Sequence, residues 1–159
     1  MTDIATTASP TVTSLTSSTP NGTYKVGDVI SIQVNFSEAV TVTGTPQLTL
    51  ETGGTDRPVS YASGSGTSTL TFSYTVQAGD TTADLDYVAT TSLALNSGAI
   101  RDSAGNSATL TLPSPGTANS LGNNQAIVID GVLPIVTSIN RVSAATTNAT
   151  SVEYTVTFT

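Results

Sequence analysis

Val29-Ile30-Ser31-Ile32-Gln33-Val34-Asn35-Phe36-Ser37 is the stretch that decides the fold. Its apolar side chains alternate strictly with polar ones. Successive side chains of a β-strand point to opposite faces of the sheet, so this alternation predicts a strand with one buried and one solvated face. Ser37-Glu38-Ala39 breaks the alternation and is expected to end the strand. Leu70 to Val76 alternates in the same way and predicts a second strand of this kind.

The pattern of the first strand returns near the end of the sequence. Val152, Tyr154, Val156 and Phe158 lie 122 residues beyond the apolar positions of the first strand, and Pro134–Ile139 lies 124 residues beyond Pro10–Leu15. Two aligned segments at nearly one spacing indicate a tandem repeat. The predicted organisation is a lead-in at residues 1–9, a complete repeat at 10–131 and the opening strands of a second repeat, truncated or strand-donating, at 132–159.

The composition favours an all-β protein. Ser and Thr make up 52 of the 159 residues, and only 9% of the residues are charged. This suits strands with polar outer faces that are joined by Gly, Asn, Ser and Pro turns. About seven to nine short strands with no helical period predict an antiparallel β-sandwich of Ig-like, Greek-key topology, which we favour over a barrel.

Charge and missing residue types exclude several functions. The net charge is −7 with only four basic residues, so the footprint that nucleic acids need is absent. The chain has no Cys and no His, which removes disulfides, thiol nucleophiles, zinc sites and His-based catalysis. No stretch approaches the length of apolar sequence that spans a membrane. The acids lie on turns and Trp is absent, so a glycosidase cleft is not expected. We predict a protein that is not an enzyme.

Three motifs carry a family resemblance: Phe36–Val40, Asp102–Asn106 and Val128–Pro134. Together, and over nearly the whole chain, they resemble the Ig-like repeats of very long secreted and surface adhesins of bacteria, which are linked to swimming or attachment. The resemblance implies an extracellular, non-catalytic spacer whose partners are neighbouring repeats of the same or an identical chain. Any glycan or surface ligand would be bound elsewhere in the full protein. It also implies calcium where domains meet, although the residues after Asp130 depart from the usual Thr-Thr-Ala-Pro.

The acidic residues are candidate calcium ligands. Ca²⁺ takes roughly six to eight hard oxygen ligands, and eleven acids against four bases leave clustered carboxylates short of cationic partners. In an Ig-like topology, Glu38 and the Asp102–Asn106 loop would share one pole. The acids that would gather at the opposite pole, beside the joint to the next repeat, are Asp28, Asp80, Asp84, Asp86 and Asp130. Without calcium, Gly131 is expected to leave the joint loose. The predicted metal ligands are Glu38, Asp84, Asp86, Asp102 and Asp130.

Simpler roles for these acids stay open. Asp and Asn in turns commonly bond to their own backbone, so Asp102 and Asn106 would then only shape a loop. Asp84, close to Tyr87, is also compatible with a tyrosine-corner type of turn.

Two other functions stay open as well. Two strands cannot bury an apolar face alone, so residues 133–159 either pack on the complete repeat or pair with another chain. Pairing would make the protein a filament subunit that assembles by donating its C-terminal strands. The third possibility is a carbohydrate-binding accessory module, in which exposed Tyr24, Tyr61 or Tyr87 would stack on sugars.

Overall fold

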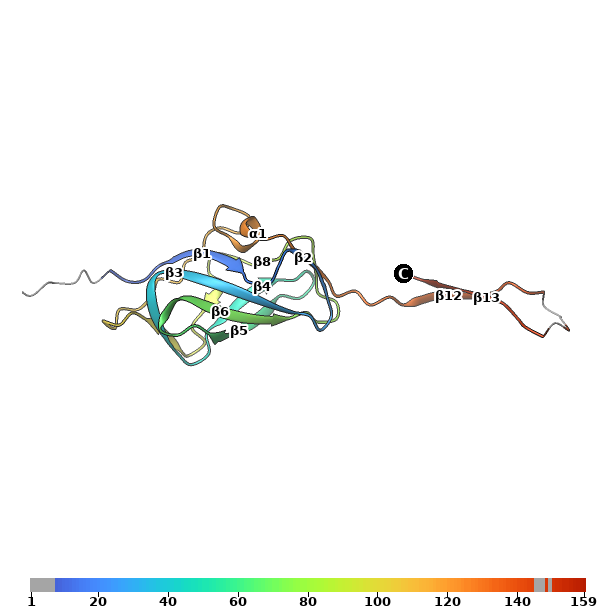
Figure 1. The fold of residues 1–159 in the computed structure, drawn as a ribbon, viewed down its shortest axis with the longest axis horizontal. Helices are drawn as coiled ribbons and strands as arrows, with labels where there is room; N and C mark the ends of the chain where they lie inside the picture. Colours follow the sequence, from blue (N-terminus) through green and yellow to red (C-terminus); the bar gives the residue numbers. More distant parts are fainter. Residues whose placement is uncertain (1–7, 145–147, 149) are drawn as a thin grey trace, which may run out of the picture.

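The structure is a computed structural model that describes residues 8–144, 148 and 150–159 (Figure 1). It confirms an all-β chain with one short helix. Most of the predicted lead-in, residues 1–7, lies outside the described residues. The elements are β1 (Val12–Ser17), β2 (Gly22–Lys25), β3 (Val29–Thr43), β4 (Gln47–Glu51), β5 (Arg57–Ser63), β6 (Thr67–Thr75), β7 (Thr81–Thr82), β8 (Asp86–Tyr87), β9 (Leu93–Ala94), β10 (Ala99–Arg101), α1 (Leu121–Asn124), β11 (Ile127–Asp130), β12 (Val136–Arg141) and β13 (Tyr154–Phe158).

The main sheet has the strand order β1-β3-β6-β5-β4-β8, with β10 added on β3 and β9 added on β4. All its pairings are antiparallel, and the strands curl into a half-barrel. A second sheet, β2-β11-β7, contains one parallel pairing, that of β2 with β11. The chain enters this body at one end and leaves it at the other (Figure 1).

Strand β3 follows the predicted alternation. Ile30, Ile32 and Val34 have no solvent exposure, whereas the polar residues between them are half-buried. The predicted end of the strand is wrong, because β3 continues to Thr43. Its register against β6 shifts between Asn35 and Val40, where residues 37–39 are exposed. The loss of alternation therefore marks a β-bulge on a long strand.

The hydrophobic core lies entirely within the predicted first repeat. Its buried apolar side chains run from Leu15 to Ile129, and none of the described residues beyond Ile129 joins them. Residues 113–124, which the sequence predicts as a Gly/Pro/Asn loop, contain one helical turn. The Ser120 side chain accepts a hydrogen bond from the Asn123 N–H and caps this turn, α1. Leu121 of this turn is fully buried, so the turn closes one side of the core.

Strands β12 and β13 form a separate two-stranded sheet that extends away from the body (Figure 1). Their pairing has the register of β1 with β3, including a shift after the first pair. The matching pairs are Val12–Phe36 and Val136–Phe158, Leu15–Val34 and Ile139–Val156, and Ser17–Ile32 and Arg141–Tyr154.

The hydrogen bonds that frame the two hairpins match as well. In the first hairpin the Ser37 N–H donates to the Thr11 carbonyl at 2.9 Å, and in the second the Thr159 N–H donates to the Ile135 carbonyl at 3.0 Å. Two hydrogen bonds that involve side chains also repeat. The bond from Thr13 Oγ1 to the Asn35 carbonyl corresponds to that from Thr137 Oγ1 to the Thr157 carbonyl. The bond from the Ser31 N–H to Thr19 Oγ1 corresponds to that from the Glu153 N–H to Ser143 Oγ. The second hairpin is therefore a structural copy of the first.

Candidate functional site

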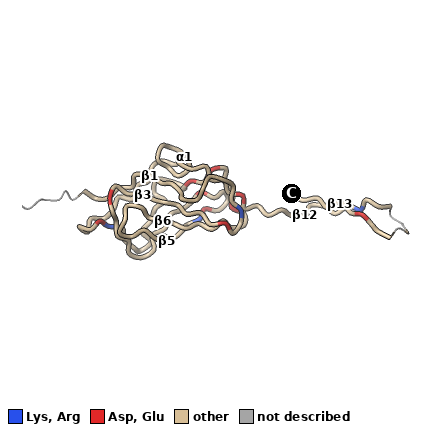
Figure 2. The backbone as a smooth tube through the Cα atoms, in the orientation of Figure 1, with Lys and Arg blue, Asp and Glu red and all other residues tan. Residues whose placement is uncertain are grey.

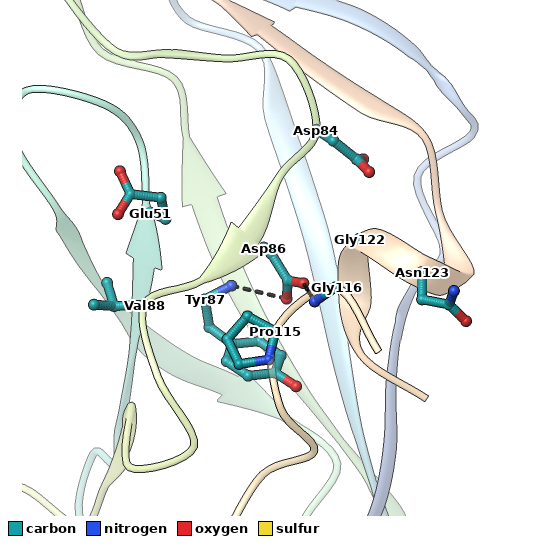
Figure 3. Close-up of a pocket in the computed structure, with 9 residues that line it drawn as sticks. All are labelled: Glu51, Asp84, Asp86, Tyr87, Val88, Pro115, Gly116, Gly122 and Asn123. Carbon is teal, nitrogen blue, oxygen red and sulfur yellow. Dashed lines mark hydrogen bonds between the residues drawn. The ribbon is translucent and has the colours of Figure 1, made fainter. Parts of the chain in front are cut away.

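Asp84 and Asp86 lie side by side at the start of β8. Leu85 between them is fully buried, and alternate residues of an extended chain point the same way. Burial of Leu85 therefore turns both carboxylates outward, over the turn of α1 (Figure 3). The Leu85 N–H donates to the Ile127 carbonyl at 2.8 Å, which fixes the pair beside the first residue of β11.

An open cleft of about 460 Å³ contains this pair. In the cleft, Asp86 accepts hydrogen bonds from the Tyr87 N–H and the Gly116 N–H, each at 2.9 Å (Figure 3). A Cβ added to Gly122 would lie 3.0 Å from Asp86 Oδ2 and 3.4 Å from Asp84 Oδ2. Both carboxylates therefore border one small space, which glycine leaves open. The lining residues are Glu51, Asp84, Asp86, Tyr87, Val88, Pro115, Gly116, Gly122 and Asn123.

The two carboxylates affect each other electrostatically. Partial burial raises the pKa of Asp84, and the negative charge of Asp86 raises it further, whereas a hydrogen bond from the Ile127 backbone acts in the opposite direction. Like charges at close range raise the energy of the ionised pair, and a bound cation would lower it. The cleft is thus the place in the described structure where an added cation would relieve repulsion.

The donor set fits a hard cation only in part. Two carboxylates of this kind suit Ca²⁺, which fills its remaining positions with backbone oxygens and water. The described residues bring together no group of three or more Asp, Glu, His or Cys that is able to hold a metal ion. Glu51 also lines the cleft, and its Oε1 accepts a hydrogen bond from the Gly53 N–H at 3.1 Å. Asp84 and Asp86 are the carboxylates that border the space beside Gly122, so these two residues would hold an ion there.

The other three predicted ligands lie apart from this pair. Asp102 accepts hydrogen bonds from the Ala104 N–H and from both the backbone and the side chain of Asn106. The bonds from Asn106 lower the pKa of Asp102, and together they close a tight loop. Asp130 accepts a hydrogen bond from the Val132 N–H at 3.3 Å, and Glu38 is exposed at the bulge of β3. Their metal-binding roles stay predictions.

The nearly buried ion pair between Arg57 and Asp80 was not predicted from the sequence. Asp80 Oδ1 lies 2.8 Å from Arg57 Nε and 2.7 Å from Nη2, while Oδ2 accepts hydrogen bonds from the Tyr74 hydroxyl and the Gln77 N–H. Burial alone would raise the pKa of Asp80, but the bonds from Arg57 and Tyr74 outweigh it and hold this pKa below its usual value. The one available signal was Tyr74, a polar-tipped residue on an inward-facing position of β6.

Gly131, at the exit from the body, is held on both sides. Its N–H donates to the Asp80 carbonyl at 2.8 Å, and its carbonyl accepts from the Gly79 N–H at 2.9 Å. A Cβ at this position would collide with the Gln77 carbonyl and lie 2.6 Å from the Asp80 carbonyl. Gly131 therefore anchors the chain before the linker begins, and the looseness of the joint without calcium stays a prediction.

The three tyrosines of the predicted sugar-binding surface are engaged in the fold. Tyr87 is only 1% exposed and its hydroxyl donates to the Pro113 carbonyl at 2.7 Å, so its predicted exposure is wrong. Tyr24 donates to the Pro20 carbonyl, and Tyr61 packs edge-on against Phe72. Among the described residues, the aromatic side chains that are exposed belong to β13.

No protein-family model matches the chain, and no curated protein or solved structure matches it either. In the described part of the chain, no helix has the length and apolar character needed to cross a bilayer.

Proposed function

We propose that this chain is a non-catalytic structural spacer of a large extracellular adhesin-type protein of bacteria. The observation that carries the proposal is the copied hairpin: β12 and β13 repeat the register, the shift and the framing hydrogen bonds of β1 and β3. A unit whose opening hairpin recurs directly after its last strand is the elementary step of a tandem array. In this proposal residues 10–131 are one repeat and residues 132–159 open the next.

The path of the chain supports a spacer. It enters the body at one end and leaves from the opposite end, where Gly131 is anchored (Figure 1). Units joined in this way extend in one direction and carry a distal binding domain away from the cell surface. The half-barrel is, in this proposal, one part of an Ig-like Greek-key sandwich, and the second sheet, β2-β11-β7, would be the other layer.

Calcium stiffening is the second part of the proposal. Acidic residues lie at both ends of the body (Figure 2), and the Asp84–Asp86 pair is next to β11, the strand that leads to the joint. A Ca²⁺ ion between these carboxylates and α1 would reduce the repulsion between the two charges. It would also connect the Asp84–Asp86 segment to α1. Asp84 and Asp86 would bind the ion, and the Gly122 backbone would leave room for it.

Small-angle scattering of linked repeats tests the spacer. Two, three and four copies of residues 10–133 joined in series should give a maximum dimension that grows in proportion to the copy number, as expected for a rod. Flexibly joined units would grow only as about the square root of their number. Calcium should increase the rod-like character, and the same chain with Asp84→Asn and Asp86→Asn is the control. Square-root growth with and without calcium would overturn the spacer proposal.

A filament subunit is the second candidate, because the β12–β13 hairpin exposes its apolar side chains. An unpaired strand edge is able to join the sheet of another molecule. In this case the intact chain should form polymers whose length increases with protein concentration, as measured by sedimentation velocity. A chain that remains monomeric over the accessible concentration range would exclude the filament and leave the spacer.

A further inference from the structure

Strand β13 has one free edge. Its residues pair with β12 on one side, and in the described structure this sheet has two strands only. In the first hairpin, the same edge of β3 is occupied by β6. The same strand edge is therefore paired in the first hairpin, where β6 occupies it, and unpaired in the second.

The filled version defines what the edge accepts. β6 runs antiparallel to β3, with Phe72 opposite Ile32 and Leu70 opposite Val34. All four side chains are fully buried. On β13, the positions that correspond to Ile32 and Val34 are Tyr154 and Val156. Their occupant is therefore expected to be an extended strand with large apolar side chains at alternate positions.

The unfilled version is open to such a strand. Tyr154, Val156 and Phe158 are 58%, 44% and 56% exposed, although their counterparts on β3 are buried. No charged residue or proline interrupts β13, whereas natural sheet edges that must remain free are commonly protected by such residues. The β13 edge is thus shaped for pairing and has no protection against it.

We propose that the free edge of β13 is a strand-acceptor site for a β6-type segment. The segment pairs antiparallel, with its phenylalanine opposite Tyr154 and its leucine opposite Val156, so that its apolar side chains cover the exposed face of the hairpin. The partner is an uncharged extended strand with the pattern of Leu70, Phe72, Tyr74 and Val76. This inference rests on the proposed tandem repeat, since it takes the contacts of the first repeat as the template for the second.

The test uses the intact chain, labelled for NMR, and a synthetic peptide with the sequence of residues 67–76. The free protein is measured first, and contacts between Val136 and Phe158 and between Ile139 and Val156 establish the hairpin. Addition of the peptide should then shift the amide signals of residues 152–158, protect them from exchange and give a contact between Tyr154 and the peptide phenylalanine. A peptide with Phe72→Asp is the control for sequence-specific pairing. Its dissociation constant should be at least about tenfold higher than that of the unchanged peptide.

Two protein variants locate the site. Val156→Lys places a charge on the apolar face of β13 and should abolish binding, whereas Thr155→Lys places it on the opposite face and should leave binding within about twofold. The acceptor site would be overturned if the folded hairpin binds no peptide, binds it elsewhere or binds the Phe72→Asp peptide equally well. These outcomes would not contradict the proposed tandem repeat. Absence of the hairpin contacts in the free protein would overturn both.

Discussion

Arg57 and Asp80 form a nearly buried ion pair, with Nη2 2.7 Å from Oδ1, at the turn to which Gly131 is bound. The Asp80 side chain is 1% exposed, and it also accepts hydrogen bonds from Tyr74 and Gln77. The Asp80 carboxylate thus joins β5 to β6, and the backbone carbonyl of the same residue binds Gly131 at the exit from the body. Removing one partner of a buried pair leaves the other charge uncompensated, which makes this the most sensitive polar contact in the fold.

Asp80→Ala should therefore lower the free energy of unfolding by about 3 kcal/mol. Arg57, the Tyr74 hydroxyl and the Gln77 N–H all lose their acceptor. The control is Lys25→Ala, which breaks the exposed Lys25–Asp28 pair and should cost less than about 0.5 kcal/mol. Urea unfolding of the three proteins measures both values. Equal losses in the two variants would show that the Arg57–Asp80 pair contributes no more than a surface contact.

Stability should fall in acid. The pKa of Asp80 is lower in the folded protein than in the unfolded chain, so its contribution is fully present above the ordinary Asp pKa of about 3.9 and is lost as the pH falls through the folded value. Asp102 contributes with the same sign. The free energy of unfolding should remain level from about pH 7 to pH 5 and decrease below about pH 4. Asp80→Asn should make that decrease shallower, and an unchanged slope would contradict the assignment.

Asp84→Asn should have opposite effects with and without calcium. The pKa of Asp84 is raised in the folded state, so its ionised form opposes folding at neutral pH, and this opposition disappears as the pH falls through the raised value. In chelator, Asp84→Asn should raise the melting temperature. With calcium at about one hundred times its Kd, the wild-type protein should gain about 2.7 kcal/mol and the variant much less.

Asp56→Asn is the matched control for this experiment, because Asp56 is an exposed carboxylate outside the cleft. It should leave the calcium response intact. If the wild-type protein shows no calcium-dependent shift, the Asp84–Asp86 cleft is not a calcium site.

Gly131→Ala should destabilise the body by about 1–3 kcal/mol, since the new Cβ collides with two carbonyls of the β6–β7 turn. The comparison is Gly54→Ala, where no atom lies within 4 Å of the added Cβ. Thermal unfolding of both variants gives the difference. Similar melting temperatures would mean that the turn yields without cost and that Gly131 is not an anchor.

Removal of residues 135–159 should leave the melting temperature of the body unchanged within about 2 °C. The buried apolar side chains all precede Val132, and those of β12 and β13 that are described are exposed. Differential scanning calorimetry of the shortened chain makes the comparison. A large decrease would show that the hairpin packs on the body.

Local patterns in the sequence predicted the strands well. The alternation of Ile30, Ile32 and Val34 decided which face of β3 is buried, and the copied pattern at Tyr154 and Val156 located the second hairpin. The interruption at Glu38 was misinterpreted as the end of a strand, because a bulge and a break leave the same gap in a local pattern.

The candidate site was predictable only as far as Leu85 and its two neighbours. Gly116 and Gly122, which complete the cleft, come from a segment about thirty residues further along the chain. No periodicity connects such distant positions. The same applies to Arg57, which lies 23 residues before Asp80 in the chain.

The parallel pairing of β2 with β11 determines how the body would respond to tension. Residues Gly22–Lys25 lie beside Ile127–Asp130, one strand near each end of the unit and both running in the same direction. Pulling the two chain ends apart would draw these strands past each other lengthwise, so their hydrogen bonds would have to break together and not one after another. A row of weak bonds loaded in shear resists rupture far better than a row that unzips. Such a unit would resist being stretched along its axis.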